Sequence, residues 1–156
     1  MPVSDAGRFT VGVFQDLAWA ANGLAALLRA ALLPESLSVL AIASAEATTL
    51  IQQLLEISPQ TLDIAGLGRV VASGPIIGAL QGASGDLERL GLSGTMWRVG
   101  FQPHDARIFE ALTAKGGVLV GIQSEPRAAD ALAVLHAYGG GNAAIGAWTG
   151  RLRPHS

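Results

Sequence analysis

His104, Asp105 and Glu110 form the one cluster in the sequence that combines a histidine with carboxylates. A histidine beside acidic groups at a helix start can act as a general base or hold a metal ion. The spacing argues against both uses, because positions 104 and 105 point in different directions on a helix and position 110 is not at i+4 from 104. The chain contains no H-x-x-x-H or H-E-x-x-H pattern. We expect these side chains to serve the positive first turn of a helix.

Two other histidines are weaker candidates. His136 follows Leu132 and Leu135 on a helical stripe, where a partly buried, hydrogen-bonded histidine is more common than a metal ligand. His155 lies in a tail with Arg151 and Arg153. Such a tail can touch phosphate or lipid headgroups, but three basic groups more often form a solvated end.

Glycine-rich and serine-containing motifs do not complete a cofactor or nucleophile site. Residues 66–68 and the triple glycine at 139–141 do not give G-x-G-x-x-G, and no G-x-x-x-x-G-K-[ST] occurs. Residues 91–94 (GLSG) lack the five-residue nucleophile elbow. Ser73-Gly74 is interpreted as a turn before Pro75. We therefore assign no catalytic, cofactor-binding or metal-binding residue and expect no enzyme activity and no cofactor.

Three tryptophans can line a ligand pocket or an interface. Trp19, Trp97 and Trp148 stand out because only 5% of the residues are aromatic. Single tryptophans more often fill a core or an interface than a cofactor pocket. Trp148, in the last expected strand, is the first choice for an interface anchor.

The composition of the 156 residues limits the class of protein further. The chain is 14% charged and 50% hydrophobic, with 20 glycines and a net charge of −2. This composition excludes disorder and gives no basic excess for nucleic acid. The absence of cysteine excludes disulfides and thiolate chemistry and suits the cytoplasm. The N-terminus does not resemble a signal peptide, and the uncharged stretches 70–85 and 131–150 are interrupted by glycine, proline or polar residues.

Hydrophobic periodicity and capping residues predict a single α+β domain over residues 1–156. Two βαβ units are expected, and together they predict a ferredoxin-like βαββαβ sandwich with strand order 4-1-3-2. Its core is residues 9–43 and 117–148, and residues 44–116 form a mostly helical, glycine-rich insertion between strands 2 and 3. The expected strands are 9–14, 37–43, 118–123 and 142–148, with an accessory strand at 69–73; the expected helices are 17–33, 44–57, one from 75, 86–99, 103–115 and one from 125 to about 136.

Three glycines occupy matched positions inside expected strands. We expect Gly12, Gly121 and Gly146 on one face of the sheet and the neighbouring valines on the other, against the two main helices. Glycine in a strand usually marks a close approach of backbone. The glycine face is therefore expected to pack against the insertion or a second subunit.

The order VGVF, helix, SVLAIA, GRVVASGP, GFQPHDA and GGVLVGI resembles that of small bacterial proteins of the general stress protein 17M-like and YflT-like group. The resemblance covers about residues 9–148 and implies an αβ-plait with a glycine-rich insert. It implies no catalytic residues. The chain departs from the group at His104-Asp105, where such proteins tend to carry an acidic pair.

The sequence is compatible with four functions. The first is a non-enzymatic, stress-associated structural or interaction protein that forms a homo-oligomer in the cytoplasm. The alternative is a small-molecule-binding sensor whose ligand is unknown. An enzyme around His104, Asp105 and Glu110 ranks third, and peripheral membrane contact through residues 76–92 ranks fourth. No nucleic-acid partner is expected.

Overall fold

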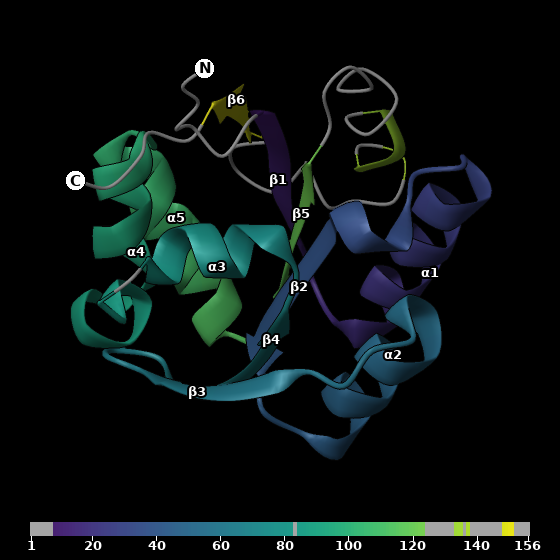
Figure 1. Cartoon of the computed structure of the whole chain (residues 1–156), viewed down its shortest axis with the longest axis horizontal. Helices are drawn as coiled ribbons and strands as arrows, with labels where there is room; N and C mark the ends of the chain where they lie inside the picture. Colours follow the sequence, from purple (N-terminus) through teal and green to yellow (C-terminus); the bar gives the residue numbers. More distant parts are fainter. Residues whose placement is uncertain (1–7, 83, 124–132, 136, 138–147, 152–156) are drawn as a thin grey trace.

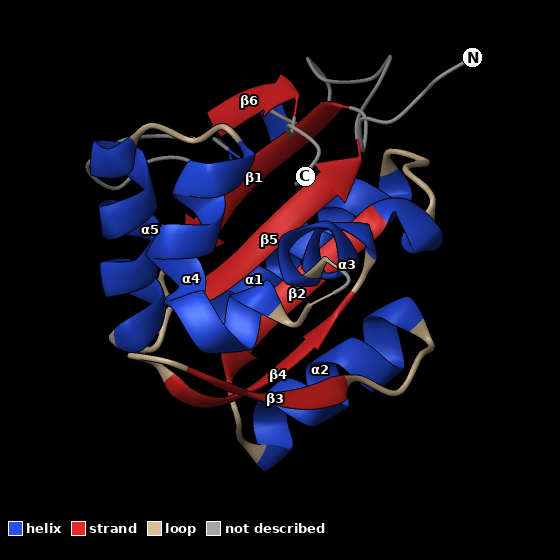
Figure 2. Cartoon of the chain, turned by 60° about the vertical axis from the view of Figure 1, so that its left-hand side comes forward, coloured by secondary structure: helices blue, strands red, loops and turns tan. Residues whose placement is uncertain are grey.

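The computed structural model describes residues 8–82, 84–123, 133–135, 137 and 148–151 (Figure 1). These residues form an α+β structure in which helices cover both faces of an antiparallel sheet (Figure 2). The strands are β1 (Arg8–Phe14), β2 (Leu37–Ile42), β3 (Gln60–Ile64), β4 (Gly68–Ser73), β5 (Val118–Gln123) and β6 (Trp148–Arg151). The helices are α1 (Leu17–Arg29), the 3-10 turn η1 (Pro34–Ser36), α2 (Ala45–Leu55), α3 (Pro75–Gln81), α4 (Asp86–Val99) and α5 (Pro103–Ala114).

The described strands make a six-stranded sheet with the order β3-β4-β2-β5-β1-β6, and every neighbouring pair is antiparallel. Strand β2 pairs with β5 on one side and with β4 on the other. It is buried along nearly its whole length, as the mostly apolar sequence of residues 37–43 predicts for a central strand.

Two helix starts follow directly from the expected capping residues. The Asp16 carboxylate accepts a hydrogen bond from the Trp19 backbone N–H at 2.9 Å and begins α1. The Ser44 hydroxyl accepts one from Ala47 at 3.0 Å and begins α2. Each bond satisfies an N–H group that the first turn of a helix leaves without a partner.

Helix α1 is shorter than the expected 17–33. It ends at Arg29 because Ala31 adopts the left-handed conformation, with φ at 68°. The Leu32 N–H then bonds to Leu27 O at 3.2 Å, and the buried Leu32 side chain packs under the helix end. This arrangement is a Schellman closure. At α5 the same closure uses Gly116, with φ at 106°, as the glycine pair at 116–117 predicts.

The sheet separates two hydrophobic clusters. On one face, helices α1 and α2 and Leu135 pack over alternate residues of β2, β4 and β5. On the other face, α3, α4 and α5 cover alternate residues of β1, β2, β3, β4 and β5. Figure 2 shows the sheet between these two layers.

The expectation that Gly12 and Gly121 share a face is wrong. Val11 pairs with Gly121 and Gly12 pairs with Val120, so each glycine stands opposite a valine. Paired residues of antiparallel strands point to the same face. Consequently Val11 belongs to the α3–α5 cluster and Val120 to the α1–α2 cluster, and the two glycines lie on opposite faces. Gly146 lies outside the described residues.

The close packing expected over a glycine in a strand is observed at Gly121, and the residue that packs there belongs to the same chain. A Cβ at Gly121 would lie 3.2 Å from Cγ2 of Ile76 in α3. Residues 44–116 therefore pack one of their helices directly on β5. They also supply α2 to the opposite face and two strands, β4 and β3, to the sheet. The accessory strand at 69–73 is observed as β4, whereas no strand was expected at β3.

The last strand lies at a different place in the sequence from the one expected. The last described strand, β6, begins at Trp148 and pairs with β1, whereas the sequence predicts a strand that ends there. Residues 142–147 lie outside the described part of the chain. Of the helix expected from 125 to about 136, residues 133–135 are described as helical.

Among the residues that the structure describes, no helix is both long enough and apolar enough to cross a bilayer.

Two helical glycines give a matched test of this packing. A Cβ at Gly23 in α1 would lie 2.2 Å from the ring of the fully buried Phe14, whereas a Cβ at Gly78 in α3 would meet nothing within 4 Å. We expect Gly23→Ala to lower the free energy of unfolding by about 1–3 kcal/mol through overpacking. Gly78→Ala should raise it by roughly 0.5–1 kcal/mol. Urea denaturation measures both, and an equal gain in the two variants would contradict the α1–β1 packing.

Candidate functional site

The structure does not bring His104, Asp105 and Glu110 together as a catalytic or metal centre. His104 is exposed and Asp105 lies in the first turn of α5, where its charge suits the positive helix end. Glu110 lies further along α5 and accepts hydrogen bonds from Ser93 in α4, at 3.0 Å from the hydroxyl and 3.3 Å from the backbone N–H. In the described part of the chain, no group of three or more histidine, aspartate or glutamate side chains can hold a metal ion.

The contact of Glu110 has a structural cause in α4. The helix is interrupted at Gly91, which has φ at 85°, and a Cβ there would lie 2.8 Å from the Ala65 carbonyl oxygen. The helix restarts after this break, so the Ser93 N–H belongs to a new first turn and needs an acceptor. Glu110 supplies it. The GLSG sequence at 91–94 is therefore a break in α4, and Glu110 of α5 caps the turn that follows the break.

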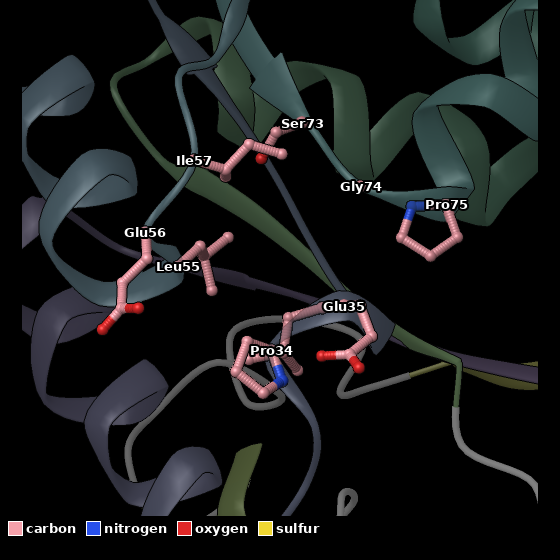
Figure 3. Close-up of a pocket in the computed structure, with 9 residues that line it drawn as sticks. Pro34, Glu35, Leu55, Glu56, Ile57, Ser73, Gly74 and Pro75 are labelled. Carbon is pink, nitrogen blue, oxygen red and sulfur yellow. The ribbon is translucent and has the colours of Figure 1, made fainter.

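A different group of residues forms a groove of about 450 Å³ where β2 begins and β4 ends. It is enclosed by η1, the C-terminal end of α2 and the turn from β4 to α3 (Figure 3). These segments are far apart in the sequence, and the pairing of β2 with β4 brings two of them together. The described lining residues are Pro34, Glu35, Leu37, Leu55, Glu56, Ile57, Ser73, Gly74 and Pro75.

Ser73 is the unusual residue of this groove. It pairs with Val39 and points to the α1–α2 face of the sheet. Its side chain is 5% exposed, and its Oγ has no hydrogen-bond partner among the described residues. In Figure 3 this hydroxyl points toward Ile57, which is 50% exposed at the rim. A buried hydroxyl without a partner costs about 1–3 kcal/mol, so the groove contains unused hydrogen-bonding capacity.

Ser38 shows the contrasting, satisfied case on the neighbouring strand. It lies on the opposite face, and its Oγ accepts a hydrogen bond from the Ile76 backbone N–H at 3.0 Å. Glycine at position 74 allows this hydrogen bond to form, because a Cβ there would lie 2.4 Å from Leu37 O and from Ser38. With φ at 108°, Gly74 lets the chain turn from β4 into α3 close above β2.

The charge of the described lining of the groove is negative. Glu35 lies in η1 and Glu56 ends α2 with φ at 58°, and both are exposed. Neither carboxylate forms an ion pair with another described residue. The carbonyl end of α2 adds a negative partial charge at Leu55 and Glu56. No described lining residue is basic. The groove therefore combines apolar walls with a rim that favours positive charge.

Two other grooves offer less. One of about 450 Å³ lies along α2 and is lined by Ala45, Glu46, Thr49, Leu50 and Gln53. Another, of about 440 Å³, lies between the end of α4 and the start of α5, where Trp97 and Pro103 line it. Neither lining includes the unpartnered Ser73.

The remaining candidates are not part of the groove. Trp19 and Trp97 are exposed, and they lie on α1 and α4. Only the strand position of Trp148 is described, and His136 and His155 lie outside the described residues. The sequence predicts a turn at Ser73-Gly74, and the structure places the turn at Gly74. The available signal for a site was a serine at the end of an apolar strand, directly before Gly-Pro.

No protein-family model, curated protein or solved structure matches this chain.

The two serines provide a test of the hydrogen bonding at this site. We expect Ser73→Ala to raise the free energy of unfolding by on the order of 1 kcal/mol, because it removes a buried hydroxyl without a partner. Ser38→Ala should lower it by about 1–3 kcal/mol, because the Ile76 N–H loses its acceptor. Chemical denaturation of both variants measures the difference. A loss of stability in Ser73→Ala would show that its hydroxyl already has a partner.

Proposed function

We propose that this chain is a small-molecule-binding domain and that the groove above Ser73 is its binding site. The observation that carries the proposal is the buried Ser73 hydroxyl, which has no partner among the described residues although it lines a groove. Binding sites combine mostly apolar walls with a few polar groups that orient the ligand. A ligand that bonds to Ser73 would offset the cost of that buried hydroxyl.

The size and lining of the groove support a small ligand. Its volume of about 450 Å³ falls within the range of roughly 300–1,000 Å³ usual for small-molecule sites. Leu37, Leu55 and Ile57 supply apolar surface, and Glu35 and Glu56 stand at the rim. We propose binding without catalysis, because no described lining residue is a histidine or lysine that could activate Ser73 as a nucleophile.

We also propose that the fold is a ferredoxin-like plait with added strands. The order β6-β1-β5-β2 supports this view, since it reproduces the expected 4-1-3-2 when these strands are numbered along the chain. Strands β4 and β3 then extend the sheet beyond β2. A place among the general stress protein 17M-like proteins of the bacterial cytoplasm remains a proposal that rests on the sequence resemblance.

A homo-oligomer is the second candidate, and one surface of α4 favours it. Leu90 and Trp97 are 38% and 61% exposed; a Cβ at Gly94 would lie 3.6 Å from Cβ of Leu90, and Trp97 follows Gly94 by one helical turn. Exposed tryptophan is enriched at the centres of protein interfaces. The outer edge of β3 is less suited to pairing with another copy, because Glu88 accepts hydrogen bonds from Asp63 and Ala65 there.

A screen of metabolites by thermal shift tests the first proposal. A ligand at about 100 times its Kd stabilises a protein by about 2.7 kcal/mol, so a true ligand should raise the melting temperature clearly. We expect Ile57→Trp, which fills the rim of the groove, to abolish the shift. Leu90→Trp, on the opposite face of the sheet, is the control and should leave the shift intact. A ligand whose effect survives Ile57→Trp would bind elsewhere and contradict the proposal.

Light scattering coupled to size-exclusion chromatography tests the second candidate. We expect an oligomer for the unmodified chain and a shift toward monomer for Trp97→Gln, because the variant removes the largest exposed apolar side chain of α4. Trp19→Gln, on α1, provides a control with the same chemical change. A monomer for the unmodified chain at micromolar concentration would contradict oligomerisation through this surface.

A further inference from the structure

We infer that the groove above Ser73 takes an organic ammonium ion, that is, a protonated amine attached to a small apolar group. This inference rests on the proposed binding function and specifies the chemistry of the ligand. It follows from the charge at the rim, the state of the two helix ends that meet there and the apolar walls.

The charge at the rim selects a cation. Glu35 and Glu56 are the charged residues of the described lining, and neither forms an ion pair with another described residue. An anion at this place would meet two carboxylates without a compensating basic side chain in that lining. A cation would interact favourably with both, and because both carboxylates are exposed this attraction weakens as salt is added.

The end of α2 adds acceptors for a cation. At α5 the N–H groups of Gly116 and Gly117 bond back to the last turn of the helix. At α2, no such backbone bond closes the helix within the described residues, although Glu56 takes the left-handed conformation. The last carbonyl groups of α2 thus retain accepting capacity beside Leu55, Glu56 and Ile57, which line the groove.

The start of α3 does not offset this preference with free donors. Pro75 has no N–H, the Ile76 N–H donates to Ser38 Oγ, and the Ile77 N–H donates to Gly74 O at 3.2 Å. The first turn of α3 therefore has its described N–H groups engaged within the chain. This leaves the carboxylates and the end of α2 to determine the charge preference.

The walls favour an organic cation over a metal ion. Pro34, Leu37, Leu55, Ile57 and Pro75 present carbon to the groove. A bare metal ion requires several ligands, and the described residues contain no cluster of three or more metal-binding side chains. An ammonium group with a short alkyl chain fits both parts: Glu35 and Glu56 at the rim attract its charge, its carbons contact the walls, and Ser73 Oγ can accept an N–H.

Three molecules of nearly equal size test this assignment: n-butylammonium, n-butanol and butyrate. Titration into ¹⁵N-labelled protein at low salt, followed through the amide signals of Ser73 and Gly74, gives an affinity for each. We expect butylammonium to bind at least fivefold more tightly than butanol, and butyrate to bind most weakly. Raising the salt concentration should reduce only the advantage of the cation.

Variants of Glu35 and Glu56 test whether these two carboxylates cause the preference for a cation. Glu56→Gln, and more strongly Glu35→Gln with Glu56→Gln, should bring butylammonium toward the affinity of butanol. Glu46→Gln removes the same charge at the other end of α2 and should leave the preference unchanged. Both substituted residues of the rim are exposed, so the fold should tolerate the changes.

The outcomes separate this inference from the proposed function. If butanol and butylammonium bind equally and the signals of Ser73 and Gly74 move, the groove binds small molecules but the cation preference is wrong. If Glu46→Gln weakens butylammonium as much as Glu56→Gln, the rim does not determine the preference and the inference is overturned. If no probe moves those signals while the Ser73→Ala variant is stable and folded, the binding proposal fails together with the inference.

Discussion

The arrangement of this protein depends on the turn from β4 into α3 at Gly74. The chain passes so close to β2 that a side chain at this position would overlap Leu37 and Ser38. The close passage allows Ser38 to accept the Ile76 N–H and allows Ile76 to cover Gly121. Helix α3 is thereby held on the sheet, and α4 packs beside it. The same turn places Ser73 at the edge of the groove on the other face.

Ser38 and Ser73 show how strand alternation places two similar side chains in different surroundings. They lie on neighbouring strands but on opposite faces of the sheet. One hydroxyl completes the backbone hydrogen bonding of α3, whereas the other remains without a partner in the described structure. A buried hydroxyl of the second kind reduces stability, and such a group in a native structure calls for an explanation. This asymmetry is the physical reason to consider the groove a binding site.

The polar residues that first suggest chemistry have a structural use. Glu110 caps the restart of α4 after Gly91, and Asp105 lies in the first turn of α5. The contact of Glu110 with Ser93 holds α4 and α5 together across a break that only glycine allows. The groove, by contrast, uses Glu35 and Glu56, which no sequence motif connects because one belongs to η1 and the other to the end of α2.

The sequence by itself determined most of the local structure. Asp16 and Ser44 begin their helices as capping residues do, Gly116 ends α5, and the apolar run at 118–123 becomes β5 with those limits. These features depend on interactions between residues close in sequence, so their signals are local. The short edge strand β3 has no such local signal, because its residues are largely polar and its pairing with β4 provides the stability.

Only the tertiary structure decided which faces meet and where the groove lies. The register of β1 with β5 sets Gly12 and Gly121 on opposite faces, and a shift by one residue would reverse every side chain. The groove exists because the pairing of β2 with β4 brings η1 to Ser73, and because α2 packs against both η1 and β4. Register and long-range pairing depend on the packing of the whole sheet. For this reason the place of Ser73 in the groove could not be predicted from its own neighbours in the chain.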